Sequence, residues 1–427
     1  MDDNTYRVIS LAGFLAVSLI AWLSGNREKV NVRTIAGSAF LAWILGALTF
    51  WFDGSRAVLQ WANDVLLDIL NASQEGSFFL LGPLALAPGQ TLPDGTPSVG
   101  FVLAFQVLPS VIFFSAAVSG LYHLGIMQAV VRFFARIFYR FLAISGAESL
   151  AASANMFVGI ESGLTVRPYL MNMTRSELLT LLTCMMATVA STVMGIYVFA
   201  LHDTFPQIAG HLISASLISI PCAVLISKLS LPEEGKPETL GDLPTEGESR
   251  NDAESSNFMM ALIDGGGQGV KMAVGIATVL IVVLGLEALA DLILLLLPQM
   301  NGEPFSVSRL LGWAVWPFAV LLGLRPEEWQ LGAEILGSRF IETEVTAYFS
   351  LAAAQSSTPP FFTERSMTVL TYALCGFVHL ASMGIFIGGL AALIPSRAKD
   401  LSILGIRALW TAFLATVLTG CIAGALV

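Results

Sequence analysis

The stretch SGAESLAASANMFVGIESGLTVRPYL (145–170) decides how this chain folds. It lies among apolar runs, yet it is too polar and too interrupted by glycine for one helix that faces lipid. Its halves, of about 12 residues each, are also too short to cross alone, because a span needs about 20 residues. The pattern predicts a re-entrant helical hairpin. Irregular backbone at that depth is tolerated only where protein shields it or where it lines a wet cavity.

The composition is that of a polytopic membrane protein. Of 427 residues, 55% are hydrophobic and only 12% are charged, whereas soluble domains have about 25% charged residues. The mean hydropathy is +0.76. The cysteines lie inside apolar runs without C-x-x-C spacing, so buried thiols are predicted rather than disulfides or a zinc site. These cysteines are Cys184, Cys222, Cys375 and Cys421.

Apolar runs predict an all-α protein with about eight transmembrane helices. They lie at roughly 7–24, 34–51, 100–122, 176–201, 208–229, 272–298, 364–395 and 400–427. The short loops 26–33 and 396–400 are rich in arginine and lysine. Since such loops stay in the cytoplasm, both termini are predicted to be outside.

One amphipathic segment follows the third predicted span. LGIMQAVVRFFARIFYRFL (124–142) has Arg132, Arg136 and Arg140 at four-residue spacing, which puts all three on one helical face. A helix along the cytoplasmic interface is predicted, with the arginines as anchors.

A second hairpin is predicted at PEEWQLGAEILGSRFIETEVTAYFSLAA (326–353), entering from the opposite face. Each hairpin is followed by two spans. Two pairs of similar short segments support an internal repeat. They are IES (160–162) with IET (341–343), and MTRSELLTLLT (173–183) with FTERSMTVLTY (362–372). Inverted repeats with a broken element in each half indicate a transporter whose substrate binds near the midplane.

The chain resembles the concentrative nucleoside transporter family over nearly its whole length. The resemblance rests on the order and spacing of FQVLPSVIFFSAAVSGLYHLGIMQ (105–128), RPYL (167–170), HLISASLISIPCAVLISKL (211–229), LGSR (336–339) and TYALCGFVHLASMGIFIGGL (371–390). It implies a homotrimer in the inner membrane that imports nucleosides with sodium or protons and needs no cofactor. It also implies a fixed scaffold and a transport part that moves as an elevator.

These expectations divide the chain into six parts. In order they are scaffold helices (1–122), an interfacial helix (123–144), a first transport repeat (145–230), an acidic flexible linker (231–257), a scaffold span with interfacial helices (258–323) and a second transport repeat (324–427). The linker is assigned because its sequence is rich in Glu, Asp, Pro and Gly.

The family resemblance also implies site residues, and the first hairpin departs from the family pattern. The family has Asn-x-x-x-Gly followed by Gln or Met, then Thr and Glu, which face the nucleobase. Here Asn155 and Gly159 match, but Ile160, Glu161 and Ser162 follow. The base-reading triplet is therefore replaced, and altered base preference is predicted.

The ribose side of the implied site is partly kept. The family's Asn-Glu-Phe-Val-Ala-Tyr corresponds to Thr343–Tyr348, so Glu344 is the predicted ribose-binding carboxylate. In the seventh span the family's Gly-Phe-Ala-Asn-x-Ser-Ser aligns so that Phe377 and Ser382 match, while His379 replaces the ribose-contacting Asn.

Cation coupling has two predicted forms. The resemblance places a sodium site at Asn155, with Ser191 and Thr192 as further candidates, and oxygen ligands suit a hard cation. Protons are the alternative, with Glu161, Glu344 and His379 as candidate carriers, since ionisable groups at membrane depth are functional by default. The alternative is a purely structural role, in which Glu161 caps the N-terminus of the second half-helix of the first hairpin.

Two competing functions also stay open. One is a transporter of the same fold that moves a non-nucleoside polar metabolite with protons. The other is a membrane gate or regulator without net transport. An enzyme is not predicted, because the sequence has no nucleophile–base constellation, metal cluster or phosphate-cradling loop, and nothing indicates a nucleic-acid partner.

Overall fold

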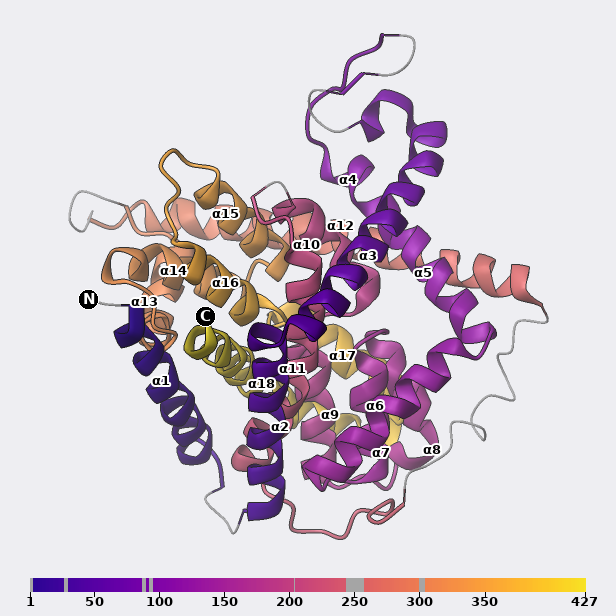
Figure 1. Cartoon of the computed structure of the whole chain (residues 1–427), viewed down its shortest axis with the longest axis vertical. Helices are drawn as coiled ribbons and strands as arrows, with labels where there is room; N and C mark the ends of the chain where they lie inside the picture. The colour runs from indigo at the N-terminus through magenta and orange to yellow at the C-terminus, as the bar shows by residue number, and fades with distance from the viewer. Residues whose placement is uncertain are drawn as a thin grey trace.

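The computed structural model shows a helical protein whose termini lie close together (Figure 1). It describes residues 3–26, 30–86, 90–91, 95–202, 204–242, 257–298 and 304–427, without the side chains of Asp53, Arg56, Ile160 and Glu161. Most of the predicted linker, 243–256, and part of the basic loop, 27–29, fall outside this description. Within the described ranges, extended pairing is limited to one isolated bridge between Thr91 and Pro97.

The described chain is helical almost throughout. The helices are α1 (Asp3–Leu23), α2 (Val32–Trp51), α3 (Asp53–Leu81), η1 (Gly82–Ala85), α4 (Leu103–Gln106), α5 (Leu108–His123), α6 (Ile126–Leu142), α7 (Gly146–Asn155), η2 (Ile160–Val166), α8 (Arg167–Leu170), α9 (Arg175–Ala187), α10 (Ser191–Leu201), α11 (Ile208–Ser230), α12 (Phe258–Leu294), α13 (Val307–Leu321), η3 (Pro326–Glu328), α14 (Trp329–Ser338), α15 (Glu344–Gln355), α16 (Glu364–Leu374), α17 (Leu380–Leu393), η4 (Pro395–Arg397) and α18 (Ala398–Leu426). The longest connections lie between η1 and α4 and between α11 and α12. Seven stretches of the described residues are helical, long and apolar enough to cross a membrane. The predicted all-α membrane fold is confirmed.

Two predicted spans are each built from two helices. The stretch 176–201 is α9 and α10, separated by three residues, and 364–395 contains α16 and α17, separated by Cys375–His379. These interruptions remain largely apolar, so hydropathy alone does not show them. Each break leaves the last carbonyls of the first helix without partners in that helix, and these must be satisfied by other groups.

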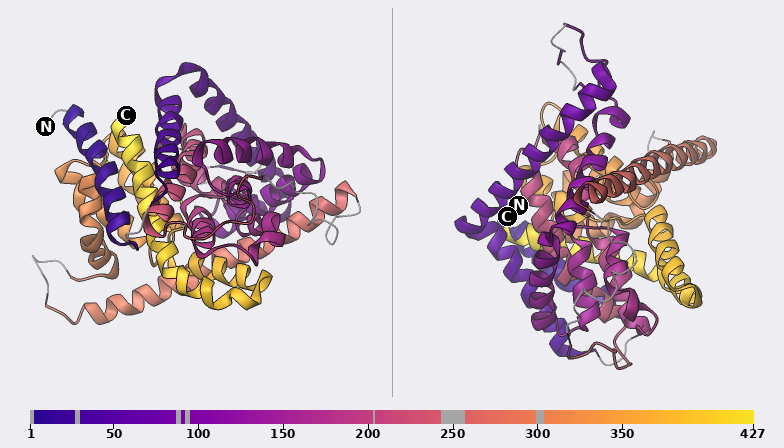
Figure 2. Two further views of the ribbon diagram at one scale, coloured as in Figure 1. Left: turned by 90° about the horizontal axis from the view of Figure 1, so that it is seen from below. Right: turned by 90° about the vertical axis from the view of Figure 1, so that its right-hand side faces the viewer.

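The long helix α12 joins two segments that the sequence suggested were separate. Residues 258–271, expected at the interface, and the following span form one helix of 37 residues. Figure 2 (right) shows α12 extending from the body of the protein, and it packs along α5. Gly265 and Gly269 permit the contact, since added Cβ atoms would lie 2.7 Å from Ser115 O and 2.6 Å from Ile112 Cα.

The first predicted hairpin consists of α7, η2 and α8, and α7 is buried along its whole length. Ser145 and Glu148 form a capping box at its start. Glu148 also pairs with Lys228 of α11 through a contact of 2.7 Å, and both side chains are buried. The hydroxyl of Ser145 donates to Glu177 of α9 at 2.6 Å. The hairpin entrance is thereby fixed to the spans that follow it.

The second hairpin, η3 with α14 and α15, begins in a related way. The backbone N–H of Arg325 donates to Glu328 Oε2 at 3.0 Å. Glu328 Oε1 accepts from the backbone N–H of Thr363 at 2.8 Å, just before α16. Each hairpin is thus tied at its start to the broken span that follows it, as the internal repeat predicts.

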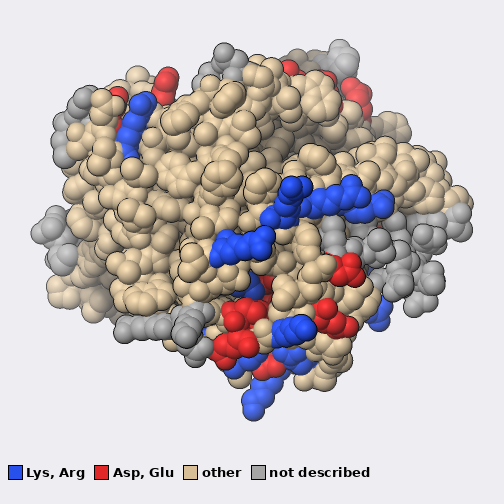
Figure 3. Space-filling view, turned by 60° about the horizontal axis from the view of Figure 1, so that its bottom comes forward, with Lys and Arg blue, Asp and Glu red and all other residues tan. Residues whose placement is uncertain are grey.

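Charge is unevenly distributed over the surface. Lysine, arginine, aspartate and glutamate side chains gather on one end of the molecule in the face seen in Figure 3, while broad areas beside them carry none. This pattern fits a protein whose sides contact lipid and whose ends contact water.

The two broken spans meet at Gly376. A Cβ atom added there would lie 2.9 Å from Met186 O and 3.0 Å from Ala187 C at the end of α9. Because both neighbours are backbone, they cannot yield by changing rotamer. The absence of a side chain at Gly376 therefore lets the two breaks approach each other, and the site described below is built around them.

We predict that Gly376→Ala lowers the thermal unfolding temperature of the purified protein, because overpacking of this kind costs about 1–3 kcal/mol. Gly384→Ala in α17 is the matched control, since an added Cβ there meets nothing within 4 Å. Equal unfolding temperatures for the two variants would show that the breaks are not in tight contact.

Candidate substrate and cation site

A cavity of about 370 Å³ lies between the broken elements and α12. One wall comes from the hairpins and the broken spans, and the other from α12. The lining residues that sequence analysis predicted are Gly159, Glu344, Phe377, His379 and Ser382. The structure thus brings residues from both repeats to one place, as the midplane site requires.

Glu344 is the centre of the polar wall. It is the first residue of α15, where the helix dipole favours a carboxylate. Its side chain is buried, and its Oε1 accepts a hydrogen bond of 2.7 Å from the hydroxyl of Tyr197 in α10. Its Oε2 lies 3.0 Å from His379 Nε2. The carboxylate therefore joins hairpin 2 to both broken spans.

Glu344 Oε2 keeps an unused acceptor despite this contact. Within the described structure it accepts no hydrogen bond of good geometry, and the same holds for Thr343 Oγ1. Both residues line the cavity. Buried acceptors are nearly always paired, so these two neighbouring oxygens are exceptions within the described residues.

His379 has a defined tautomer in this arrangement. It is the N-cap of α17, and its Nδ1 accepts from the backbone N–H of Ser382 at 3.1 Å. A ring nitrogen that accepts carries no proton, so this geometry places the ring N–H on Nε2, which lies 3.0 Å from Glu344 Oε2.

The remaining predicted ligands in the seventh span shape the break. The Ser382 hydroxyl lies 2.5 Å from Phe377 O and 2.8 Å from His379 O, so it satisfies backbone carbonyls that the break exposes. Phe377 is half-buried in the cavity wall and lies against Phe386, with ring centroids 6.1 Å apart. It offers an aromatic surface to a ligand.

The first hairpin contributes differently from the prediction. Gly159 lines the cavity, but Ser162 is buried and its hydroxyl lies 3.3 Å from Asn155 Oδ1. Ser162 therefore faces the predicted cation position rather than the cavity. The side chains of Ile160 and Glu161 lie outside the described part of the chain.

Asn155 contacts the broken end of α9. Its Nδ2 donates to Cys184 O at 2.9 Å and to Thr188 Oγ1 at 2.5 Å. The predicted companions lie elsewhere: Ser191 donates to Phe157 O at 2.9 Å, and Thr192 lies 3.9 Å from the sulfur of Met272 in α12. The oxygens nearest Asn155 thus include Thr188 and Ser162 instead. Within the described ranges, no group of three His, Cys, Asp or Glu side chains is placed to hold a metal ion.

Several residues in or beside the site are not predicted from the sequence. Thr188 and Tyr197 lie in apolar context, and they contact Asn155 and Glu344 behind the cavity wall. Gln268 and Lys271 of α12 line the cavity itself. Lys271 could have been identified from the sequence, because a charged residue within an apolar run is unusual and indicates a functional site.

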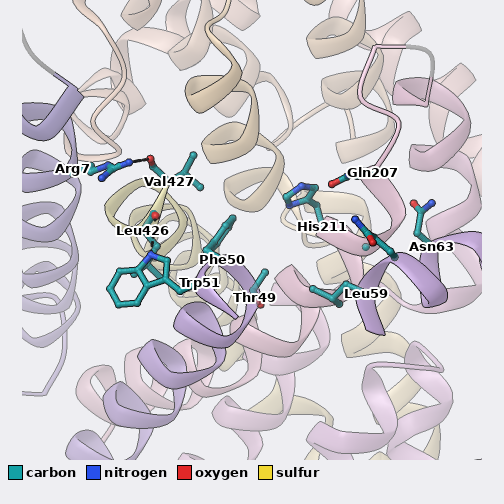
Figure 4. A pocket seen from close by; sticks show the side chains of 12 residues that line it. Arg7, Thr49, Phe50, Trp51, Leu59, Asn63, Gln207, His211, Leu426 and Val427 are labelled. Carbon is teal, nitrogen blue, oxygen red and sulfur yellow. Dashed lines mark hydrogen bonds between the residues drawn. The ribbon is translucent and has the colours of Figure 1, made fainter. Parts of the chain in front are cut away.

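A second cavity, of about 620 Å³, lies near the two termini (Figure 4). Its lining includes Arg7, Trp51, Asn63 and His211, and Arg7 donates to Val427 O at 3.0 Å. None of the predicted site residues lines it. The smaller cavity is therefore the candidate site.

Fold and site together define a class: a helical secondary transporter with two hairpin repeats around a central polar site. Comparison with known sequences agrees. Residues 211–424 match the family described as Na+ dependent nucleoside transporter C-terminus, and residues 12–84 match its N-terminus. Residues 104–204 match the Gate family, described as nucleoside recognition. The chain belongs to the concentrative nucleoside transporter family, and it is a multi-pass protein of the plasma membrane.

Individual relatives cover nearly the whole chain. The nucleoside permease NupC of Helicobacter pylori is 31% identical over 98% of this chain and 97% of its own length. An uncharacterized transporter of Haemophilus influenzae is 31% identical over 98% of this chain and 96% of its own length. Sodium/nucleoside cotransporter 1 of Rattus norvegicus is 31% identical over 98% of this chain, which spans 64% of the rat protein.

Solved structures show the same fold. CNTnw in an inward-facing substrate-bound state is similar with a TM-score of 0.88 and 29% identity, over 99% of this chain and 98% of that one. A CNTnw variant in an outward-facing state has a TM-score of 0.89 and 28% identity, over 99% of this chain and 98% of that one.

We predict that Glu344 and His379 act as a coupled pair in stability. In a double-mutant cycle of Glu344→Gln and His379→Asn, the double mutant should lose less unfolding free energy than the sum of the losses of the two single mutants. The difference, which is the coupling energy, should be about 0.5–3 kcal/mol. Unfolding temperatures of the four purified proteins measure it. A control cycle pairs Gly384→Ala with Glu344→Gln. Additive losses in the first cycle would contradict the pair.

Proposed function

We propose that the protein imports nucleosides by sodium-coupled symport, with the cavity beside Glu344 as the substrate site. The observation that supports this most is the convergence of residues from both repeats, including Glu344, His379 and Phe377, on one cavity. A carboxylate such as that of Glu344 accepts hydrogen bonds from hydroxyl groups, which a ribose supplies. The names of the relatives, which include nucleoside permease and sodium/nucleoside cotransporter, point to the same substrate class.

The remaining walls fit the other parts of a nucleoside. Phe377 offers an aromatic face, and Gly159 lets the ligand approach the backbone of hairpin 1. In the proposed pose the base lies beside Gly159 of hairpin 1. The family resemblance implies that the next residues in the sequence, Ile160 and Glu161, read the base, and a carboxylate prefers exocyclic amino groups. Gln268 and Lys271 on α12 face the same space from the other side.

Sodium is the proposed coupling ion, at Asn155 with Thr188 and Ser162. Asn155 Oδ1 now faces the hydroxyl of Ser162, which can rotate so that both oxygens coordinate an ion. Carbonyl and hydroxyl oxygens are the ligands that a hard cation prefers. Proton coupling through His379 is disfavoured, because a second ring proton would break its cap on Ser382.

The proposed mechanism is alternating access by an elevator movement in a homotrimer. In this scheme the hairpins and broken spans move together past α12, which carries the opposite wall of the cavity. Solved structures of CNTnw and its variants are described as inward-facing, intermediate and outward-facing, so several states are known for a related protein. The exposed apolar surface of α12, with Ile281 at 75% exposure, is available to lipid or to another subunit.

We predict that nucleosides raise the thermal unfolding temperature of the purified protein in sodium, and less so in choline. A ligand that binds only the folded state stabilises it by about 2.7 kcal/mol at a hundred times its Kd. Glu344→Gln should lose this shift while its unliganded protein stays folded. Gly384→Ala is the control and should keep it.

The panel should include pyrimidine and purine nucleosides with and without exocyclic amino groups. A preference for amino-bearing bases that disappears in Glu161→Thr supports the proposed orientation. If no nucleoside changes the unfolding temperature of folded protein, the proposed function is wrong.

A further inference from the structure

Arg339 is a fully buried guanidinium at the end of the first half of hairpin 2. It directly follows α14, and its side chain is 0% exposed. Its Nη1 donates to Ala373 O at 2.7 Å, and its Nη2 donates to Thr416 Oγ1 at 2.6 Å. The ring of Phe413 lies beneath it, with the guanidinium carbon 5.5 Å from the centroid. Both hydrogen bonds go to neutral oxygens, so they leave a full positive charge in the interior.

The position of this charge has a counterpart in the first repeat. Thr174 and Thr363 are the N-caps of α9 and α16, the first halves of the two broken spans. Counting ten residues from each cap (184 − 174 and 373 − 363) leads to Cys184 and Ala373. The carbonyls of these two residues are therefore equivalent in the repeat.

The two hairpins contact these equivalent carbonyls with different chemistry. In the first repeat Asn155, the last residue of α7, donates a neutral amide N–H to Cys184 O at 2.9 Å. In the second repeat Arg339 donates from a cation to Ala373 O. Each group also contacts a threonine hydroxyl, Thr188 in one case and Thr416 in the other.

A helix end of this kind attracts positive charge. The last carbonyls of α9 and of α16 have no partners within their helices, and each end carries about half a negative charge. In the second repeat the guanidinium neutralises that end permanently. In the first repeat the contacting side chain is neutral, so the end of α9 is left to an exchangeable cation.

We propose that Arg339 is a fixed cation that takes, in the second repeat, the place that the coupling sodium ion takes in the first. This inference rests on the proposed sodium site at Asn155. It assigns one exchangeable cation per protomer to these two related positions. It also makes the docking of hairpin 2 on α16 independent of sodium, whereas the docking of hairpin 1 on α9 depends on it.

The test measures thermal unfolding of purified protein against sodium at constant ionic strength, with choline as the replacement and no nucleoside present. The wild type should show one saturating sodium-dependent rise. Arg339→Gln should unfold at a lower temperature in choline and recover through an additional sodium-dependent component, because sodium can then fill the second position. Arg339→Lys should follow the wild-type curve.

A second pair of variants keeps the test valid if Arg339→Gln does not fold, because it adds a fixed cation to the first repeat instead of removing one from the second. Asn155→Lys places a fixed cation in the first repeat, so it should abolish the sodium-dependent rise while keeping an unfolding temperature in choline at or above that of the wild type. Asn155→Ala should also lose the rise, but from a lower starting temperature in choline. The difference between these two variants isolates the charge from the loss of the amide.

Two results would overturn the inference. One is an Arg339→Gln deficit that sodium does not reduce, and the other is an Asn155→Lys protein that is no more stable in choline than Asn155→Ala. Because nucleosides are absent, failure here is distinct from failure of the proposed substrate, which the nucleoside panel tests separately.

Discussion

Two helices end inside the protein at membrane depth, and the rest of the structure depends on satisfying their free carbonyls. An unpaired backbone group in this environment costs several kcal/mol, whereas a continuous helix would leave none. The breaks after α9 and α16 are covered by hairpins that are anchored at their far ends by buried caps, including the Glu148–Lys228 pair. Gly376 lets the two breaks touch. A binding site results because the same polar groups that cover the breaks also face the cavity.

The chemistry of the cavity follows from this arrangement. Glu344 begins α15, receives a hydrogen bond from Tyr197 and lies beside His379, which itself caps α17. Glu344 and His379 each stabilise a helix end and also line the cavity. Tyr197 donates a hydrogen bond from its hydroxyl to Glu344. A ligand that supplies donors to Glu344 therefore links hairpin 2 to both broken spans. Such a link gives binding a direct effect on how the mobile elements pack, which a symporter needs.

The sequence allowed prediction of the all-α fold and assigned Glu344, His379 and Phe377 to one implied site, but it did not show that Glu344 and His379 are in contact. The length and hydropathy of the apolar runs predict the spans, and the resemblance to the family assigns the site residues. The breaks themselves were hidden, since Thr188 and Cys375 are ordinary residues of apolar helices. For that reason the sequence indicates Ser191 and Thr192 as cation ligands, whereas Thr188 and Ser162 contact Asn155 in the structure. Lys271 is not predicted as a site residue, because only the packing of α12 shows that it lines the cavity.

Transport against a gradient is the central claim, and uptake into proteoliposomes tests it most directly. Radiolabelled nucleoside, chosen by the stabilisation panel, is offered to vesicles under an inward sodium gradient, with potassium inside and out as the control. We expect transient accumulation above the external concentration, and we expect it to be abolished when the sodium gradient is absent and in Glu344→Gln. Uptake that only reaches equilibrium, at the same rate with and without sodium, would contradict the claim.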